Sequence, residues 1–143
     1  MIHEFSAGGV VYKKSEGRIL ILMAQHSYHH GWVFPKGLIG DSIEGESKES
    51  TATREVEEET GALAKILKPL SAINYWFTFS GERRKKTVYY YLMEFISSDE
   101  SKRDNEMEAV EWLPVDQVEK RLTFKGDKKV WQEAKTLLMA YSK

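Results

Sequence analysis

Apolar and polar positions repeat along the chain with two different periods. Some segments alternate every second residue or form short apolar runs, as strands do, whereas others repeat about every 3.6 residues, as helices do. Glycine-containing turns at 14–17 and 80–82 separate neighbouring strand-like segments. The pattern predicts strands over 2–13, 19–24, 63–79, 87–96 and 110–113.

Two longer segments have helical spacing. The first, over 47–60, carries small apolar residues four positions apart, Ala52 and Val56, which give it one side to pack on a sheet. The second, over 127–141, has an apolar stripe that is expected in the core, and a short helix is expected to open at Pro114. Strands therefore alternate with helices, without repeats or low-complexity linkers. The periodicity predicts a mixed α/β fold and a single domain over 1–143.

Composition is that of an ordinary globular protein, with 41% hydrophobic and 30% charged residues. The net charge of −1 offers no basic excess, so no stable nucleic-acid partner is expected. Cysteine is absent, which excludes disulfide and thiol chemistry. The first residues lack the features of a signal peptide, and no apolar run reaches membrane-spanning length. We therefore expect a cytoplasmic protein without a membrane partner, and the oligomeric state is open.

Carboxylates crowd one stripe of the first helix. Glu55, Glu58 and Glu59 are spaced i, i+3 and i+4, so they project from one side, whereas Glu57 points away. Like charges in this arrangement repel one another unless a multivalent cation lies over them. The hard, oxygen-preferring ions Mg²⁺ and Mn²⁺ suit such a site. A solvated acidic helix face is the alternative interpretation.

The three glutamates belong to a longer pattern. From Gly40 to Ala62 the sequence follows G-x5-E-x7-R-E-U-x-E-E-x-G-U, where U is aliphatic. The fixed positions are filled by Gly40, Glu46, Arg54, Glu55, Glu58, Glu59 and Gly61. This pattern resembles the box of the Nudix hydrolases. The resemblance implies the Nudix fold, an α/β/α sandwich with a central mixed β-sheet. It also implies hydrolysis of a phosphoanhydride that depends on Mg²⁺ or Mn²⁺.

Several box residues have a physical task. Ser47 can cap the start of the helix, and Gly61 can supply the left-handed residue that ends it. The guanidinium of Arg54 can pair with Glu46 from the preceding loop and so orient the glutamates, although a routine surface pair is the alternative. By resemblance, the principal metal ligands are Glu55 and Glu59. Glu58 is a further ligand or the base that deprotonates the attacking water.

The loop before the box departs from the family pattern. In most relatives the glycine of a Pro-Lys-Gly triplet is also the first glycine of the box, but here Leu38–Gly40 follows Gly37, so the loop is three residues longer. Either Gly37 or Gly40 can therefore take the structural role. Lys36 is a candidate for a metal contact through its carbonyl or for a phosphate contact through its ammonium, and a solvated loop lysine is the alternative.

Motifs in the second half resemble those of bacterial diadenosine tetraphosphate hydrolases. By this resemblance Lys86 contacts the phosphate chain, whereas Tyr75 and Phe124 are candidates to stack on adenine. Tyr89 is a further candidate substrate contact, although strand propensity alone explains tyrosine there. Glu106 is a candidate additional metal ligand or base, with a solvated acidic loop as the alternative.

The expected substrate is a small-molecule nucleotide, a dinucleoside polyphosphate, and the expected reaction is asymmetric cleavage of diadenosine tetraphosphate to ATP and AMP. Alternatives are an oxidised nucleoside triphosphate, an RNA 5′-triphosphate end or a diphosphoinositol phosphate. A non-catalytic nucleotide-binding module is a further alternative, but the intact glutamates disfavour it. Histidines at 26, 29 and 30 lack the acidic or cysteine spacing of a transition-metal site, so they form a substrate-facing or an exposed loop.

Overall fold

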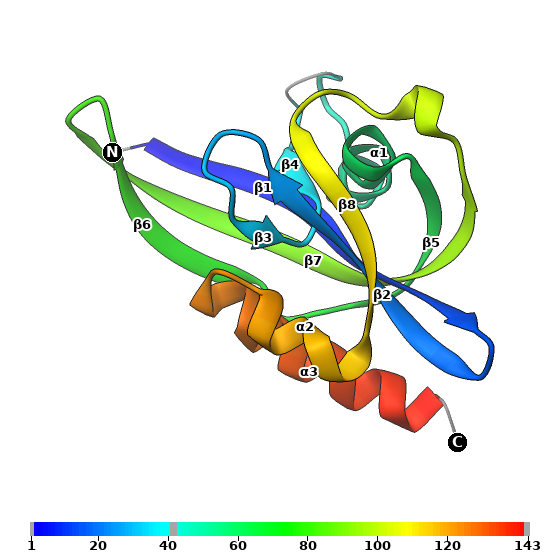
Figure 1. Ribbon diagram of the computed structural model, residues 1–143. Helices are drawn as coiled ribbons and strands as arrows, with labels where there is room; N and C mark the ends of the chain where they lie inside the picture. Colours follow the sequence, from blue (N-terminus) through cyan, green and yellow to red (C-terminus); the bar gives the residue numbers. More distant parts are fainter. Residues whose placement is uncertain (1, 41–42, 142–143) are drawn as a thin grey trace.

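The computed structural model describes residues 2–40 and 43–141, and within them one eight-stranded sheet lies between helices (Figure 1). The strands are β1 (Ile2–Ser15), β2 (Arg18–His26), β3 (Trp32–Val33), β4 (Lys36–Leu38), β5 (Ala62–Pro69), β6 (Ile73–Phe79), β7 (Glu82–Ser98) and β8 (Met107–Pro114). The helices are α1 (Lys48–Thr60), α2 (Val115–Arg121), α3 (Lys125–Tyr141) and the 3₁₀ turn η1 (Glu100–Lys102).

The sheet is mixed. Its main path runs β3-β2-β1-β7-β5, with β4 paired to β1, β6 to β7 and β8 to β2. The central pair β1–β7 is parallel, from Ile2 opposite Arg84 to Tyr12 opposite Glu94, and the other strand pairs are antiparallel. Parallel neighbours need a long connection, and the chain between β1 and β7 passes through β2, β3, β4, α1, β5 and β6.

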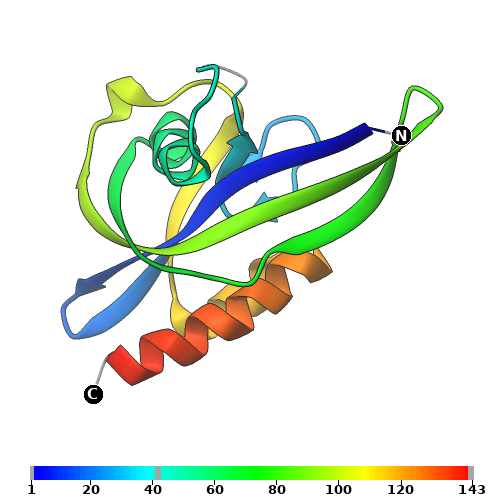
Figure 2. The same ribbon diagram turned by 180° about the vertical axis from the view of Figure 1, so that it is seen from behind.

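Helices cover both faces of this sheet. On one face α1 packs through Ala52 and Val56 against residues of β1 and β7 such as Val11 and Met93. On the other face α3 packs through an apolar stripe that includes the fully buried Trp131. Figure 2 shows α3 lying along the side of the sheet opposite α1. The expected α/β class with a central mixed sheet is therefore confirmed.

The expected single strand over 63–79 is wrong. The chain forms β5 and β6, which pair with different halves of β7 and are separated at 70–72. The N–H of Leu70 donates to the carbonyl of Tyr90 at the break, and the N–H of Ser71 donates to Glu133 of α3. These long-range partners redirect the backbone where local propensity favours continued strand. β7 is also longer than the expected 87–96.

None of the helices in the described part of the chain is long and apolar enough to cross a lipid bilayer.

Candidate active site

The first helix presents its glutamates in defined directions. Its start is capped by Ser47, whose Oγ accepts from the N–H of Ser50 at 3.1 Å, and it ends at Gly61 with a left-handed φ of 78°. Glu55 and Glu59 lie on the buried side of α1, whereas Glu57 and Glu58 are more exposed. Both predicted caps are observed, whereas Glu58, like Glu57, is partly exposed and is not buried with Glu55 and Glu59.

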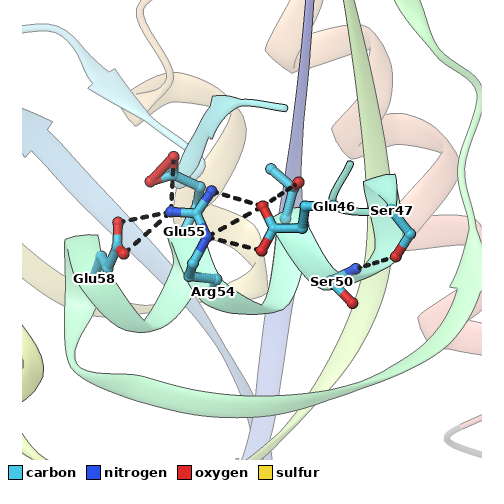
Figure 3. A network of polar contacts seen from close by, with 7 residues as sticks. Glu46, Ser47, Ser50, Arg54, Glu55 and Glu58 are labelled. Carbon is cyan, nitrogen blue, oxygen red and sulfur yellow. Dashed lines mark hydrogen bonds and ion pairs between the residues drawn. The ribbon is translucent and has the colours of Figure 1, made fainter. Parts of the chain in front are cut away.

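Arg54 joins the loop before α1 to the glutamates. Its Nε donates to Oε2 of Glu46 at 2.9 Å, and its Nη1 donates to Oε2 of Glu58 at 3.0 Å and lies 3.7 Å from Oε2 of Glu55 (Figure 3). The Arg54 side chain is only 16% exposed, which distinguishes this network from a routine surface pair. Arg54 therefore fixes the side chains of residues on both sides of it.

Replacing Arg54 with lysine is expected to keep the charge but lose the planar fork that holds Glu46 and Glu58 together. Residues that orient metal ligands in this way typically contribute about 10–100-fold to metal affinity or activity. We therefore expect kcat/KM to fall by about that factor. Steady-state kinetics across a magnesium titration measure the change, and an Arg54→Lys enzyme with unchanged magnesium dependence would contradict the orienting role.

The contact with Arg54 also links stability to pH. Hydrogen bonding to Arg54 lowers the pKa of Glu46 below its ordinary value of 4.5, although burial opposes this shift. A carboxylate whose pKa is lowered by folding stabilises the protein fully above its unfolded pKa and loses that contribution as pH falls through the folded pKa.

In Glu46→Gln, the free energy of unfolding is therefore expected to fall by about 2 kcal/mol at pH 7, and the difference from wild type should shrink below about pH 4.5. Urea unfolding at pH 7 and pH 3 measures it. The exposed Glu44→Gln serves as the matched control and should match wild type at both pH values. A Glu46→Gln difference that did not narrow in acid would be inconsistent with the ionised pair.

Glu59 is a buried carboxylate with one unsatisfied oxygen. Glu59 is only 1% exposed, and its Oε1 accepts a hydrogen bond from the backbone N–H of Lys36 at 3.2 Å. Its Oε2 is buried with no hydrogen-bond partner among the described residues. Burial, reinforced by the charge of Glu106, raises the pKa of Glu59 well above its usual range. A cation bound to Oε2 would satisfy this oxygen and remove the cost of burying it.

The loop glycines have separate functions. A Cβ on Gly37 would overlap the carboxylate of Glu55, so β4 can approach α1 this closely only because residue 37 has no side chain. Gly40 instead occupies a turn with φ of 80°, which the left-handed region permits most readily for glycine. Both glycines have a structural role, and the three-residue extension begins directly after the close approach at Gly37 and ends at the Gly40 turn.

Glu55, Glu58, Glu59 and Glu106 line one cavity of about 510 Å³, which we call the acidic cleft. Lys36, Lys86 and Tyr75 line it too, and so does Asp104, which the sequence did not single out. The backbone N–H of Asp104 donates to the carbonyl of Glu58 at 2.6 Å, which brings the loop before β8 to the end of α1. The predicted metal and phosphate contacts are thus brought together.

The acidic cleft fits a hard divalent cation. No three histidine or acidic side chains in the described residues form a ready metal cage, and Glu58 is held by Arg54. Mg²⁺, however, is usually bound by one or two carboxylates together with water and substrate phosphates. Glu55 and the unsatisfied Glu59 provide carboxylates of this kind, so the residues present suit such an ion.

A second cavity, of about 610 Å³, adjoins the first and is called here the aromatic cleft. Tyr75 and Phe124, the expected base-stacking residues, line it together with Asp127. Asp127 is buried and accepts the hydroxyl of Tyr90 at 3.1 Å. His29, Lys36 and Tyr75 line both cavities, so the two form one continuous cleft.

Lys86 and His29 add ionisable side chains to the acidic cleft, and His29 also lines the aromatic cleft. Burial lowers the pKa of Lys86, which lines the acidic cleft as expected for a phosphate contact. His29 stacks on His26 with ring centroids 4.2 Å apart and meets the edge of Phe124 at 5.5 Å. The histidine loop therefore faces the cleft, whereas Tyr89 is absent from the residues that line either cavity in the described chain.

Sequence reasoning missed Asp104 and Asp127. Asp104 was visible only as one of several acids in a polar loop, and Asp127 only as the first residue of a predicted helix. Neither has a local signal that separates a cleft residue from a surface one.

Comparisons with known proteins agree with this geometry. The family model described as NUDIX domain matches residues 3–134. A protein of Mycobacterium tuberculosis described as mutator protein MutT4 is 36% identical over 96% of this chain, which spans 56% of that protein's length. The asymmetrical bis(5′-nucleosyl)-tetraphosphatase of Rattus norvegicus is 33% identical, with 83% of this chain and 79% of that protein covered.

Solved structures share the architecture. A binary complex of the Ap4A hydrolase of C. elegans superposes with a TM-score of 0.72 at 24% identity, covering 96% of this chain and 98% of that one. At this identity the likeness concerns the fold.

Proposed function

Because this chain belongs to the Nudix hydrolase family, we propose that it is a magnesium-dependent pyrophosphohydrolase of dinucleoside polyphosphates that cleaves diadenosine tetraphosphate asymmetrically to ATP and AMP. The proposal treats residues 1–143 as one catalytic domain. The family hydrolyses diphosphate bonds and generally uses divalent metal ions. What is proposed is the substrate, the metal and the residues that act on them.

The order of side chains along the continuous cleft carries the proposal. Glu55, Glu59 and Lys86 line the acidic cleft, Lys36 and Tyr75 line both cavities, and Phe124 lines the aromatic cleft. This order matches a nucleotide whose base lies between aromatic rings and whose phosphates extend past ammonium groups toward a metal. A site that bound phosphate alone would not require the aromatic residues.

Each residue can then be given a task. Glu55 and Glu59 would hold a divalent ion, which would offset the charge of the phosphate chain and make the attacking water more acidic. Lys36 and Lys86 offset the charge of the phosphate chain, which the glutamates would otherwise repel. Glu58, held by Arg54, accepts the proton of the attacking water.

Glu106 contributes a further ligand at the rim of the acidic cleft, where its side chain is 50% exposed and lies 3.5 Å from His26. Tyr75 and Phe124 hold the base, which fixes the phosphorus to be attacked relative to Glu58. Water attack at that phosphorus breaks the phosphoanhydride directly, so no covalent enzyme intermediate forms.

A substrate panel with resolved products tests the proposal. Diadenosine tetraphosphate, an oxidised deoxyguanosine triphosphate, an RNA 5′-triphosphate and a diphosphoinositol phosphate are each incubated with wild type and with Glu58→Gln. We expect the highest kcat/KM for diadenosine tetraphosphate with ATP and AMP as products, and loss of turnover with retained nucleotide binding in Glu58→Gln. Faster turnover of the oxidised triphosphate would show that this triphosphate, and not diadenosine tetraphosphate, is the preferred substrate. If none of these substrates were hydrolysed in the presence of magnesium, the chain would be a non-catalytic binding module.

A further inference from the structure

A third cavity of about 610 Å³ shares Leu38 with the acidic cleft, and no task was assigned to it above. Its walls are formed by His3, Glu4, Phe5, Tyr89 and the segment Leu38–Gly40, and the carboxylate of Glu4 is paired with Arg84 at 3.1 Å. That segment is the three-residue extension by which this chain departs from the family pattern. We therefore call the cavity the insertion groove.

The floor of the insertion groove is aromatic. The rings of His3 and Phe5 are stacked with centroids 4.2 Å apart, and Phe5 and Tyr89 are nearly parallel at 6.5 Å with an interplanar angle of 9°. Phe5 is 41% exposed, so part of its ring is open to a ligand. Lys48 of α1 places its Nζ 4.5 Å from the centroid of Tyr89. A partly exposed aromatic ring beside a cation is suited to stacking a nucleobase and to attracting the phosphate attached to it.

The insertion groove is connected to the acidic cleft. Leu38 lines both cavities, and the chain runs from Lys36 at the acidic cleft through β4 to Gly40 at the groove. The aromatic cleft joins the acidic cleft through other residues, His29, Lys36 and Tyr75. The acidic cleft therefore shares lining residues with two cavities that contain aromatic side chains, the aromatic cleft and the insertion groove.

We propose that the insertion groove binds the second nucleoside of a dinucleoside polyphosphate, with its base stacked on Phe5 and its phosphate chain passing Leu38 into the acidic cleft. This inference rests on the proposed function. A dinucleoside polyphosphate has a base at each end of its phosphate chain, and a chain crossing the acidic cleft from Tyr75 must leave it on another side. The Leu38–Gly40 extension thus distinguishes substrates with two nucleosides from those with one.

The test compares diadenosine tetraphosphate with adenosine 5′-tetraphosphate, which has the same phosphate chain and lacks the second nucleoside. In Phe5→Ala the ratio of the two kcat/KM values, dinucleotide over mononucleotide, is expected to fall about tenfold, the effect of one lost base stack. Phe5→Tyr, which keeps the ring, should restore the ratio. Phe79→Ala is the matched control, because Phe79 is 59% exposed and lies outside the three cavities.

Binding provides a readout that does not depend on turnover or on a variant's stability. Calorimetric titration of wild type with methylene-bridged diadenosine tetraphosphate and with adenosine tetraphosphate should give tighter binding of the dinucleotide by about tenfold. Equal affinities in wild type, or a ratio unchanged by Phe5→Ala in a folded protein, would overturn the second site and leave the proposed function intact. Failure of wild type to cleave diadenosine tetraphosphate would overturn the proposed function itself.

Discussion

Glu59→Gln is expected to lower kcat by about three orders of magnitude, more than the 10–100-fold typical of residues that only orient a metal ligand. Glutamine keeps the size of the side chain and the acceptor for the N–H of Lys36, so the fold of α1 and β4 should persist. What it loses is the buried, unsatisfied oxygen that would carry negative charge once an ion is bound. A neutral amide binds Mg²⁺ far more weakly than a carboxylate does.

Thermal unfolding in the presence and absence of magnesium separates loss of the metal from loss of the fold. Magnesium should raise the melting temperature of wild type, because a ligand that binds only the folded state stabilises that state. It should raise the melting temperature of Glu59→Gln only slightly. Glu57→Gln is the matched control, since Glu57 lies two positions away on the outer side of α1. A magnesium response that survives in Glu59→Gln would show that the ion binds elsewhere.

Gly37→Ala is expected to lower kcat/KM by about 100-fold through a single added methyl group. The new Cβ overlaps the Glu55 carboxylate, so either β4 retreats or Glu55 turns away from its position beside Arg54. β4 is paired with β1 through Gly37 opposite Ala7, which limits how far the strand can move. A displacement of about 1 Å of a catalytic group is enough for a loss of this size.

Gly17→Ala is the control for this substitution. Gly17 lies in the turn between β1 and β2 with φ of 78°, and an added Cβ meets no atom within 4 Å. This change should cost about 1 kcal/mol of stability through backbone strain and leave kcat/KM unaltered. Comparing kinetics and urea unfolding for both variants therefore separates strain from active-site damage. Equal kinetic losses in the two would contradict the close approach at Gly37.

The predictions from sequence that held are those with a local cause. Ser47 and Gly61 cap the helix through bonds to residues three and four positions away, and the spacing of Glu55, Glu58 and Glu59 is set by the helix itself. The pairing of Arg54 with Glu46 crosses only eight positions. Motifs of this range can be derived from one sequence because the geometry of one element determines them.

The predictions that failed or were incomplete depend on distant contacts. The break between β5 and β6 is set by Tyr90 and Glu133, which lie far along the chain from Leu70 and Ser71. Tyr89 stays a predicted substrate contact, and its position in the insertion groove follows from the parallel pairing of β1 with β7, which brings it beside Phe5. A local pattern does not show whether a tyrosine in a strand faces a cleft, a groove or the core.

One crystallographic measurement tests the central claim, that divalent ions bind over the α1 glutamates and receive a phosphate chain whose base lies in the aromatic cleft. Crystals grown with Mn²⁺ and methylene-bridged diadenosine tetraphosphate would locate the ion by its anomalous scattering. We predict a peak at metal–oxygen bonding distance, about 2.1 Å, from carboxylates of Glu55 and Glu59, with one base between Tyr75 and Phe124. Ions bound away from these glutamates, with the analogue present, would contradict the account.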